Sequence, residues 1–256
     1  MSMQIETPQS FIVQEECEKA AWQNGFRRKL GEAGGWAGFA STTVPGTIHL
    51  AAAGAQGPWF LALDHAGVIE ELDFPTAATP GPGLACYAFE TLGQLYGVLP
   101  RIYQLAASLP DLPLREFQRR VKNLPKTTEA ERLVVQRIGQ SIFRTSLMEY
   151  WQGRCPLTGI TDPALLRASH IVPWKDCASD ADRLDVHNGL LLSALWDAAF
   201  DRGLVSFDDH GRPVVGSPLS DAAVAALNPA SVPALLLTQE HQKRLAWHRD
   251  NVWQTD

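Results

Sequence analysis

The stretch Leu166–Phe207 reads LRASHIVPWKDCASDADRLDVHNGLLLSALWDAAFDRGLVSF and decides the fold of the second half of the chain. Its apolar positions predict a strand that ends near His170, a second strand at NGLLLS (188–193) and a short helix at ALWDAAFDRG (194–203) that a glycine stops. The polar segment KDCASDADRLDVH (175–187) connects the two strands. The expected order is therefore strand, long loop, strand and helix.

Segments on both sides of this stretch belong to the same predicted domain. In front of it, PLTGITDPALLRASH (156–170) predicts a β-hairpin whose TDP turn leads into the strand that ends at the histidine. Residues 127–151 predict one long helix, because TTEAE supplies a threonine cap and a glutamate that can reach back to it. Residues 203–215 predict a closing hairpin around DDHG, and residues 240–252 predict a last helix.

The first hundred residues predict a separate module. Residues 10–30 have helix-like spacing up to the breaker cluster GEAGGW, and residues 87–109 have it again with an interruption at Pro100. Between them lie short β-like runs at 36–42, 47–52 and 59–63. We therefore expect an α+β protein, with a small N-terminal α+β module at 1–110, a connector at 111–126 and a second domain at 127–256.

The net charge of −6 is distributed unevenly. Residues 1–100 contain four Lys or Arg against ten Asp or Glu, whereas residues 101–256 contain eighteen of each. Basic residues outnumber acidic ones between 115 and 144, which predicts a local basic face that could contact DNA phosphates. A solvated helix surface is the alternative interpretation. The candidate DNA contacts are Arg132, Arg137, Arg144 and Lys175.

Several classes of protein are disfavoured by what the sequence lacks. No apolar run approaches the roughly 20 residues of a membrane span, and the N-terminal segment has no signal-peptide pattern, so a cytoplasmic protein without membrane contact is expected. The four cysteines form no CxxC pair, which argues against a disulfide framework and against a structural zinc site. They are Cys17, Cys86, Cys155 and Cys177.

Four polar residues of the deciding stretch could form a catalytic centre. Asp197 and Asp201 are four residues apart, so on a helix they share one face and could bind one cation, for which Mg²⁺ or Mn²⁺ suits carboxylate ligands. The imidazole of His170 can take a proton from water at neutral pH, which makes it a candidate general base. The amide of Asn188 could bridge the long loop and orient that histidine. Together these residues point to phosphodiester hydrolysis.

Four segments in this order, with similar gaps, match a known family. They are RIGQSIFRTSLMEYWQGRCPLTGI, ASHIVPW, RLDVHNGLLLSALWDAAFDRGLVSF and LAWHR. Residues 127–252 thereby resemble the HNH endonuclease domain of bacterial restriction-like proteins. The resemblance implies a ββα-metal fold, one divalent ion, DNA as substrate and cleavage that leaves 5′-phosphate ends. By position, His170 matches the general base, Asn188 the middle asparagine, and Asp197 and Asp201 the helix positions that hold the metal.

Three features depart from the family's pattern. Many HNH sites place an Asp or His directly before the base to bind metal, and here this position is Ser169, a weaker metal ligand that could act through water. Trp196 stands where a number of relatives carry histidine. The third residue of the His-Asn-His motif is therefore replaced by a carboxylate in this sequence. The CxxC pairs with which many HNH domains bind a structural zinc are missing, so the hydrophobic core must hold the domain together.

The sequence therefore predicts a metal-dependent endonuclease that cuts double-stranded DNA, as a restriction-type enzyme in bacterial defence. Cutting of both strands would favour a homodimer. A non-catalytic DNA-binding or regulatory protein that kept a degenerate HNH fold is the alternative, and RNA or structured junctions are alternative substrates. The N-terminal module could recognise a DNA sequence or a modified base, although ordinary core packing explains its aromatic residues at least as well. These residues are Trp36, Phe39, Trp59, Phe60, Tyr87 and Phe89.

Overall fold

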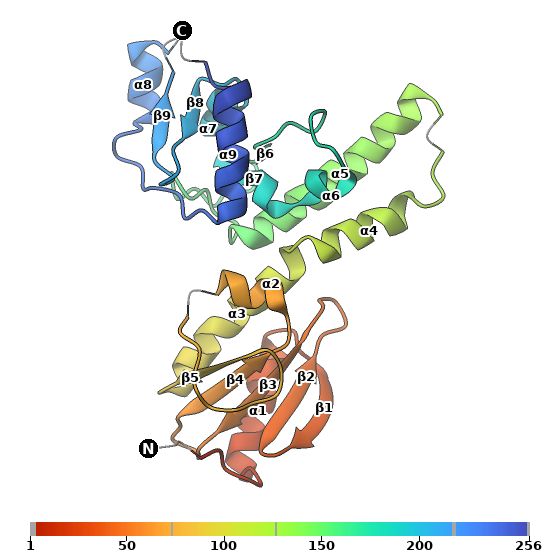
Figure 1. The fold of residues 1–256 in the computed structure, drawn as a ribbon, viewed down its shortest axis with the longest axis vertical. Helices are drawn as coiled ribbons and strands as arrows, with labels where there is room; N and C mark the ends of the chain where they lie inside the picture. Colours follow the sequence, from red (N-terminus) through yellow and green to blue (C-terminus); the bar gives the residue numbers. More distant parts are fainter. Residues whose placement is uncertain (1–3, 73, 126, 217–218, 255–256) are drawn as a thin grey trace. The chain divides into compact units, whose positions relative to one another are not determined.

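The computed structural model describes residues 4–72, 74–125, 127–216 and 219–254. The chain forms two compact units, Met1–Leu112 and Pro113–Asp256 (Figure 1). Each unit contains helices and antiparallel strands, so the predicted α+β class is confirmed. None of the described helices is long and apolar enough to cross a membrane.

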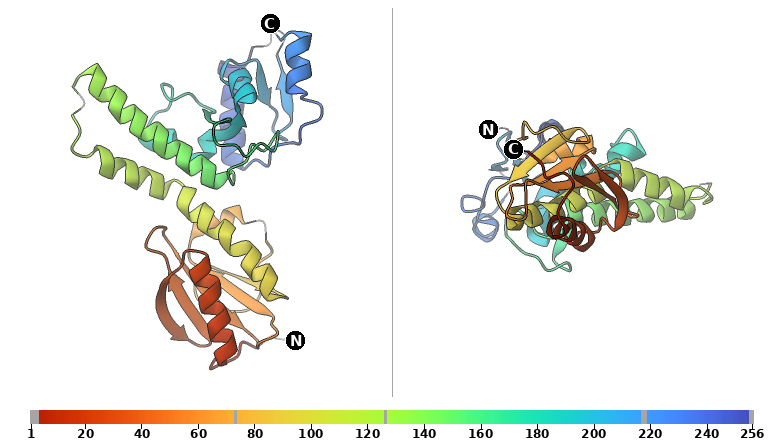
Figure 2. Two further views of the ribbon diagram at one scale, coloured as in Figure 1. Left: turned by 180° about the vertical axis from the view of Figure 1, so that it is seen from behind. Right: turned by 90° about the horizontal axis from the view of Figure 1, so that it is seen from below.

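The first unit is built on a five-stranded antiparallel sheet in which every strand pairs with its neighbour in the sequence. The strands are β1 (Arg28–Ala33), β2 (Trp36–Ala40), β3 (Thr47–Ala52), β4 (Trp59–Leu63) and β5 (Ala85–Phe89). The helices are α1 (Phe11–Gln23), α2 (Ala66–Glu71) and α3 (Leu92–Ser108). Figure 2 shows α1 and α3 side by side on one face of this sheet.

The core of the first unit contains the aromatic residues that the sequence singled out. All six are at most 8% exposed, so core packing accounts for them and the aromatic-pocket interpretation is not supported for the set as a whole. Trp36 and Phe60 contact each other at a ring distance of 6.4 Å within a buried cluster. Tyr87 and Phe89 also border a cavity of about 500 Å³ beside Phe74.

Two helices predicted for the first unit were placed wrongly. The helix expected over residues 10–30 ends at Gln23, and residues 28–33 instead form the edge strand β1. The helix expected over residues 87–109 begins only at Leu92, because residues 85–89 pair with β4. Pro100 lies inside α3 without ending it. In both places, pairing with a neighbouring strand outweighs the helix-like spacing of a short segment.

The second unit contains two small two-stranded sheets and several helices. The helices of this half of the chain are α4 (Asp111–Val121), α5 (Glu129–Tyr150), α6 (Asp180–Leu184), α7 (Ala194–Asp201), α8 (Asp221–Leu227) and α9 (Gln239–Asn251), with a 3₁₀ turn η1 (Val186–Asn188). The strands are β6 (Leu166–His170), β7 (Gly189–Ser193), β8 (Val205–Phe207) and β9 (Pro213–Val215).

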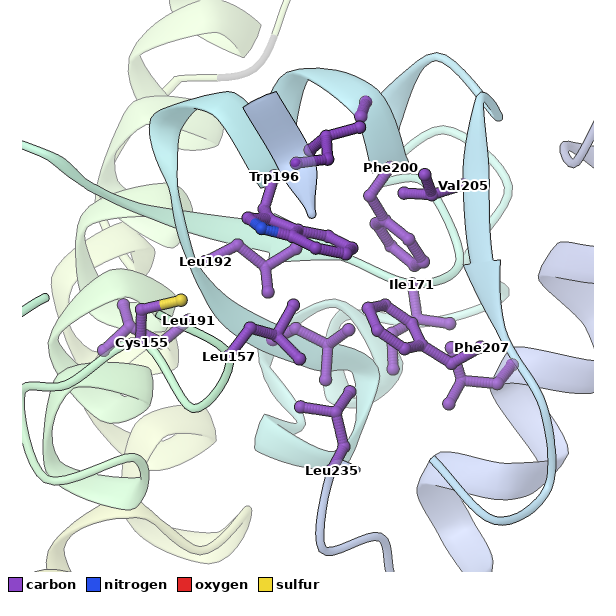
Figure 3. Close-up of a cluster of buried hydrophobic side chains, with 14 of the residues drawn as sticks. Cys155, Leu157, Ile171, Leu191, Leu192, Trp196, Phe200, Val205, Phe207 and Leu235 are labelled. Atoms are coloured by element: carbon purple, nitrogen blue, oxygen red, sulfur yellow. The ribbon is translucent and has the colours of Figure 1, made fainter. Parts of the chain in front are cut away.

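The pair β6 and β7 is the centre of the second unit. The strands run antiparallel, with His170 opposite Gly189 and Leu166 opposite Ser193, and α5 and α7 both pack against them. Figure 3 shows the side chains of Trp196 and Phe200 pointing from α7 into a buried cluster with Leu157. This cluster fixes α7 against the strands, because its apolar side is fully removed from water.

Three expectations for the second half of the chain need correction. Residues 156–160 form turns and not the first strand of a hairpin, so β6 pairs with β7 across the long loop. The segment 111–126, expected as a connector, contains helix α4, and Lys126 within it lies outside the described residues. Helix α8 was not predicted. The long helix, the NGLLLS strand, the short helix, the closing hairpin and the last helix are present close to their predicted bounds.

Candidate active site

The residue before the proposed general base contacts the first acidic residue of α7. The hydroxyl of Ser169 on β6 donates a hydrogen bond to Oδ1 of Asp197. Ser169 is buried and Asp197 is half-buried. This contact forms because α7 follows β7 without a linker and packs back onto β6. Two of the three side chains expected to bind metal are therefore brought together.

Asp201, the third of these side chains, lies one helical turn after Asp197 and is exposed. Burial raises the pKa of Asp197, and the nearby charge of Asp201 raises it further, whereas the hydrogen bond from Ser169 lowers it. Asp201 also favours the protonated form of His170 and so raises its pKa. Negative charge is thus concentrated at this end of α7, close to the histidine.

The ring of His170 is fixed by three contacts on the side of β6 that faces α5. It stacks on Phe143 with a distance of 3.8 Å between ring centroids, and it meets the ring of Trp174 edge-on at 5.7 Å. Its Nε2 lies 2.9 Å from the carbonyl oxygen of Arg183. His170 forms no hydrogen bond to Asp197 or Asp201 within the described part of the chain, and of the two carboxylates only Asp201 affects its pKa through charge.

Burial lowers the pKa of His170, which outweighs the opposite effects of the Arg183 carbonyl and of Asp201. The imidazole is therefore neutral at neutral pH. A carbonyl oxygen only accepts hydrogen bonds, so Nε2 must carry the ring proton and Nδ1 must carry the lone pair. No hydrogen bond to Nδ1 is formed among the residues that the structure describes. The ring is thus oriented as a base whose accepting nitrogen is available.

Asn188 closes the long loop between β6 and β7. Its Oδ1 accepts from the backbone N–H of Val172 at 2.8 Å, and its Nδ2 donates to the carbonyl oxygens of Val172 and Asp182 at 3.1 and 3.2 Å. The side chain is buried with 1% exposure. Because both ends of the amide bond the loop itself, Asn188 is a positioning residue that holds the segment after His170.

Arg183 is a site residue that the sequence did not single out. Its Nε donates to the carbonyl oxygen of Trp174 at 3.1 Å, and its guanidinium also reaches the carbonyl oxygen of Cys177 at 3.0 Å and Asp180 at 2.9 Å. The same residue offers its own carbonyl to His170. From the sequence, an arginine inside a polar loop is expected to be a solvated surface charge. Only the folded loop shows that its guanidinium joins several parts of the loop by hydrogen bonds.

Oxygen donors of the type that hard divalent cations prefer lie at this end of α7. Among the described residues, no group of three or more His, Cys, Asp and Glu side chains could hold a metal ion. The structure does bring together the hydroxyl of Ser169 with Asp197, and Asp201 lies near enough to repel Asp197. Mg²⁺ and Mn²⁺ keep several waters and take only one or two carboxylates from a protein. Such an ion would relieve the electrostatic repulsion between the carboxylates of Asp197 and Asp201.

Comparison with known proteins identifies the segment that carries this site. Residues 155–208 match the family model of the HNH endonucleases. No curated protein matches the chain. The matched segment includes Ser169, His170, Asn188, Asp197 and Asp201, so the predicted resemblance is confirmed and the second half of the chain contains an HNH endonuclease domain.

The HNH domain presents its four candidate DNA-contacting residues in different environments. Arg144 is tied to the domain, because its guanidinium donates to the carbonyl oxygens of Leu166 and Pro163 at 2.8 and 2.7 Å. Arg132 is exposed near the beginning of α5 and donates to the carbonyl oxygen of Thr127 at 3.4 Å. Arg137 and Lys175 are exposed. Arg144 therefore anchors the start of β6 to α5, whatever else it contacts.

Trp196, at the helix position where the resemblance led us to expect histidine, belongs to the core. It is 1% exposed and stacks with Phe207 at a ring distance of 6.2 Å. Asp197, the next residue, faces Ser169 instead. The side of α7 with Trp196 thus packs into the core, and the side with Asp197 faces the candidate site at Ser169.

Proposed function

We propose that the HNH domain is a metal-dependent DNA endonuclease in which His170 is the general base. The observation that carries this proposal is the orientation of its ring, which the Arg183 carbonyl fixes with the proton on Nε2 and the lone pair on Nδ1. Burial keeps the ring neutral, so it can accept a proton at neutral pH. A histidine that served only the core would not need its accepting nitrogen left open.

The reaction is the hydrolysis of one phosphodiester bond. Nδ1 of His170 takes a proton from a water molecule as the water oxygen forms a bond to phosphorus. The bond between phosphorus and the 3′-oxygen breaks, the electron pair stays on that oxygen, and a proton from solvent completes the 3′-hydroxyl. The phosphate group stays on the 5′-oxygen of the downstream fragment, so the cut leaves a 5′-phosphate end, as the family resemblance implies.

Asp197 and Asp201, with Ser169, are the residues that would hold the cation. A bound divalent cation supplies positive charge to the phosphate and to the departing oxygen. The carboxylates alone would repel a phosphate, because two negative charges lie close together at this end of α7. Ser169 contributes by holding Asp197 in place and by favouring its ionised form.

Cleavage of plasmid DNA in the presence of Mg²⁺ or Mn²⁺ tests the proposal. We expect nicking that stops when the metal is chelated, and a rate loss of at least about 100-fold in His170→Ala, since general bases contribute this much or more. His210→Ala is the matched control, because this histidine is exposed on the β8–β9 turn of the same domain. Asp197→Ala should weaken metal-dependent cutting while the domain stays folded.

The proposal fails if wild-type protein does not cut plasmid, methylated DNA or hydroxymethylated DNA with either metal. Retained DNA binding without cutting would instead support the alternative of a non-catalytic DNA-binding or regulatory protein. Structured junctions and RNA, used as substrates in the same assay, identify a different nucleic-acid preference.

We further propose a restriction-type role in the cytoplasm, in which the first unit selects the DNA and the HNH domain cuts it. The division into two compact units supports this arrangement, since each unit has its own sheet and buried core. One active site attacks one strand at a time, so double-strand cleavage would call for a homodimer. Cleavage of DNAs that differ only in base modification, with sedimentation of the protein alone and with DNA, tests these points.

A further inference from the structure

A polar cavity of about 650 Å³ lies beside Asp201 in the HNH domain. Its walls come from three places: the loop after His170, the end of α7, and the end of α9 with the residues that follow it. This volume falls within the range of about 300–1,000 Å³ that small-ligand sites occupy. The cavity shares Asp201 with the proposed metal site, so a ligand bound there would lie next to the reacting phosphodiester.

Two cationic side chains line this cavity from separate elements. Lys175 belongs to the loop after β6, and Arg202 directly follows α7. Both side chains are exposed, and neither forms an ion pair or a hydrogen bond with the described residues. Cations that are not used within the protein are available to a phosphate group, which is the ligand that Lys and Arg bind most commonly in nucleic-acid sites.

Trp247 gives the same cavity an aromatic surface. It is half-buried on α9, and two hydrogen bonds lie in the wall of the same cavity. Asn251 donates to the carbonyl oxygen of Trp247 at 2.8 Å, and Gln254 donates to the carbonyl oxygen of Arg202 at 2.9 Å. An indole beside two cations is the combination with which proteins bind an unstacked base together with its phosphate.

Acidic groups in the cavity limit which ligand fits. Asp176 and Asp201 also line it, so its charges balance in the absence of a metal ion. A cation bound at Asp197 and Asp201 would remove that balance and leave the cavity positive. A phosphate-containing ligand is therefore favoured when the proposed metal site is filled, which links the cavity to the substrate of the domain.

We propose that this cavity binds the nucleotide next to the scissile phosphodiester, with its phosphate between Lys175 and Arg202 and its unstacked base against Trp247. This inference rests on the proposed nuclease function and adds the part of the substrate that the domain holds. The ligand class is a single nucleotide unit of DNA whose base has left the helical stack.

Binding of fluorescein-labelled DNA to the His170→Ala protein, with Mg²⁺ present, measures this site without cleavage. Lys175→Ala and Arg202→Ala should each weaken binding severalfold and reduce the slope of log K against log salt by about one. Trp247→Ala should weaken binding of single-stranded DNA by roughly 10-fold, since stacking on an aromatic ring contributes about 1–3 kcal/mol per base. Trp247→Phe should retain most of the affinity, which separates stacking from an effect on folding.

Arg212→Ala is the matched control, because this exposed arginine lies in the β8–β9 turn and does not line the cavity. The inference is overturned if the Lys175, Arg202 and Trp247 variants bind DNA as the control does. That result would leave the nuclease proposal standing if the wild-type protein still cuts. Loss of DNA binding in these variants, combined with no cutting by the wild-type protein, would support nucleotide binding in the cavity and refute the proposed nuclease activity.

Discussion

The hydroxyl of Ser169 acts against the effect of burial on Asp197. Burial raises the pKa of this carboxyl group, the hydrogen bond from Ser169 lowers it, and the charge of Asp201 raises it further. A serine at this position therefore does not simply replace an acidic metal ligand with a weaker one. It stabilises the charged form of Asp197, which is the form that the proposed metal ion would require.

We predict that Ser169→Ala shifts the acid limb of metal-dependent cleavage to higher pH. The substitution removes the hydrogen bond that lowers the pKa of Asp197, so the carboxyl group stays protonated to a higher pH. Rates measured across pH at a fixed metal concentration check this. Ser193→Ala is the control, because Ser193 is equally buried on β7 and makes no capping bond to α7. An unchanged or lowered acid limb would contradict the prediction.

The loop between β6 and β7 is the element that holds the proposed base, His170. The guanidinium of Arg183 donates hydrogen bonds to two carbonyl oxygens of this loop, and its backbone carbonyl oxygen accepts one from His170. The side chain and the backbone of this residue therefore both help to hold His170 in place. Trp174 contributes through its ring, which lies edge-on to His170 and under the guanidinium of Arg183 at 5.7 Å. The orientation of the base is therefore a property of the folded loop.

Arg183→Ala should lower kcat by about 10- to 100-fold while the affinity for DNA changes little, because a misplaced catalytic group can cost about 100-fold. Arg183→Lys should recover only a small part of the loss, since one ammonium cannot replace a planar fork that reaches several acceptors. Cleavage kinetics and DNA binding, measured together with thermal unfolding, check both variants. If affinity falls and kcat does not, Arg183 is a DNA contact and the positioning role is wrong.

Helix α5 supports the same loop through a glycine. A methyl group at Gly139 would overlap the ring of Trp174 and press against Phe117, whereas a methyl group at Gly97 in α3 would meet no atom within 4 Å. Gly139→Ala should therefore lower cleavage and thermal stability, although alanine is the better helix former. Gly97→Ala should leave cleavage unchanged and stabilise the protein by about 0.5–1 kcal/mol. Equal effects of the two substitutions on cleavage would show that the close contact between Gly139 and the ring of Trp174 is not important for the site.

Elements with a clear local pattern could be predicted from the sequence, and elements defined by distant pairing could not. The apolar run in NGLLLS, the threonine cap at 127–128 and Gly203 are local signals, and β7, α5 and α7 lie where these signals place them. Strand β6 was recognised, but its partner was placed at 156–160, because a hairpin with a short turn is the simplest pairing for an isolated strand. The true partner follows a long polar loop.

The same distinction applies to the candidate site. Residue types and spacing predicted that Asp197 and Asp201 share one face of a helix, whereas Ser169 became a candidate only through the family resemblance. The roles of Arg183 and Trp174 depend on a loop whose path no local pattern specifies. The cavity beside Asp201 depends in addition on α9, which lies far along the chain from the motif.

At the level of the whole domain, α9 completes the core through a buried histidine. His248 is 1% exposed, stacks on Phe200 at 4.0 Å, and has Ser206 at 3.0 Å from Nδ1 and the Phe200 carbonyl oxygen at 3.2 Å from Nε2. Burial lowers its pKa to about 4. His248 is therefore neutral in the folded protein over the physiological range, while in the unfolded chain it titrates near 6.5.

Because the folded pKa of His248 lies below the unfolded value, its contribution to stability is present above about pH 6.5 and is lost as pH falls toward 4. The expected loss is on the order of 3 kcal/mol. Urea unfolding across this range should show a decline for the wild-type protein and a smaller decline for His248→Gln, which keeps a donor and an acceptor. Parallel pH profiles for the two proteins would show that another group causes the acid sensitivity.

Helix α9 also ties the site to a late part of the chain. Arg244 pairs with Asp185 at 2.6 Å beside Asn188, His248 packs on α7, and Trp247 lines the cavity that contains Asp201. During synthesis, a ribosome-bound chain in which residues 239–251 have not yet emerged possesses the histidine and both acids but lacks their support. Under the nuclease function proposed above, we therefore expect cleavage to begin only after this helix has left the exit tunnel and docked.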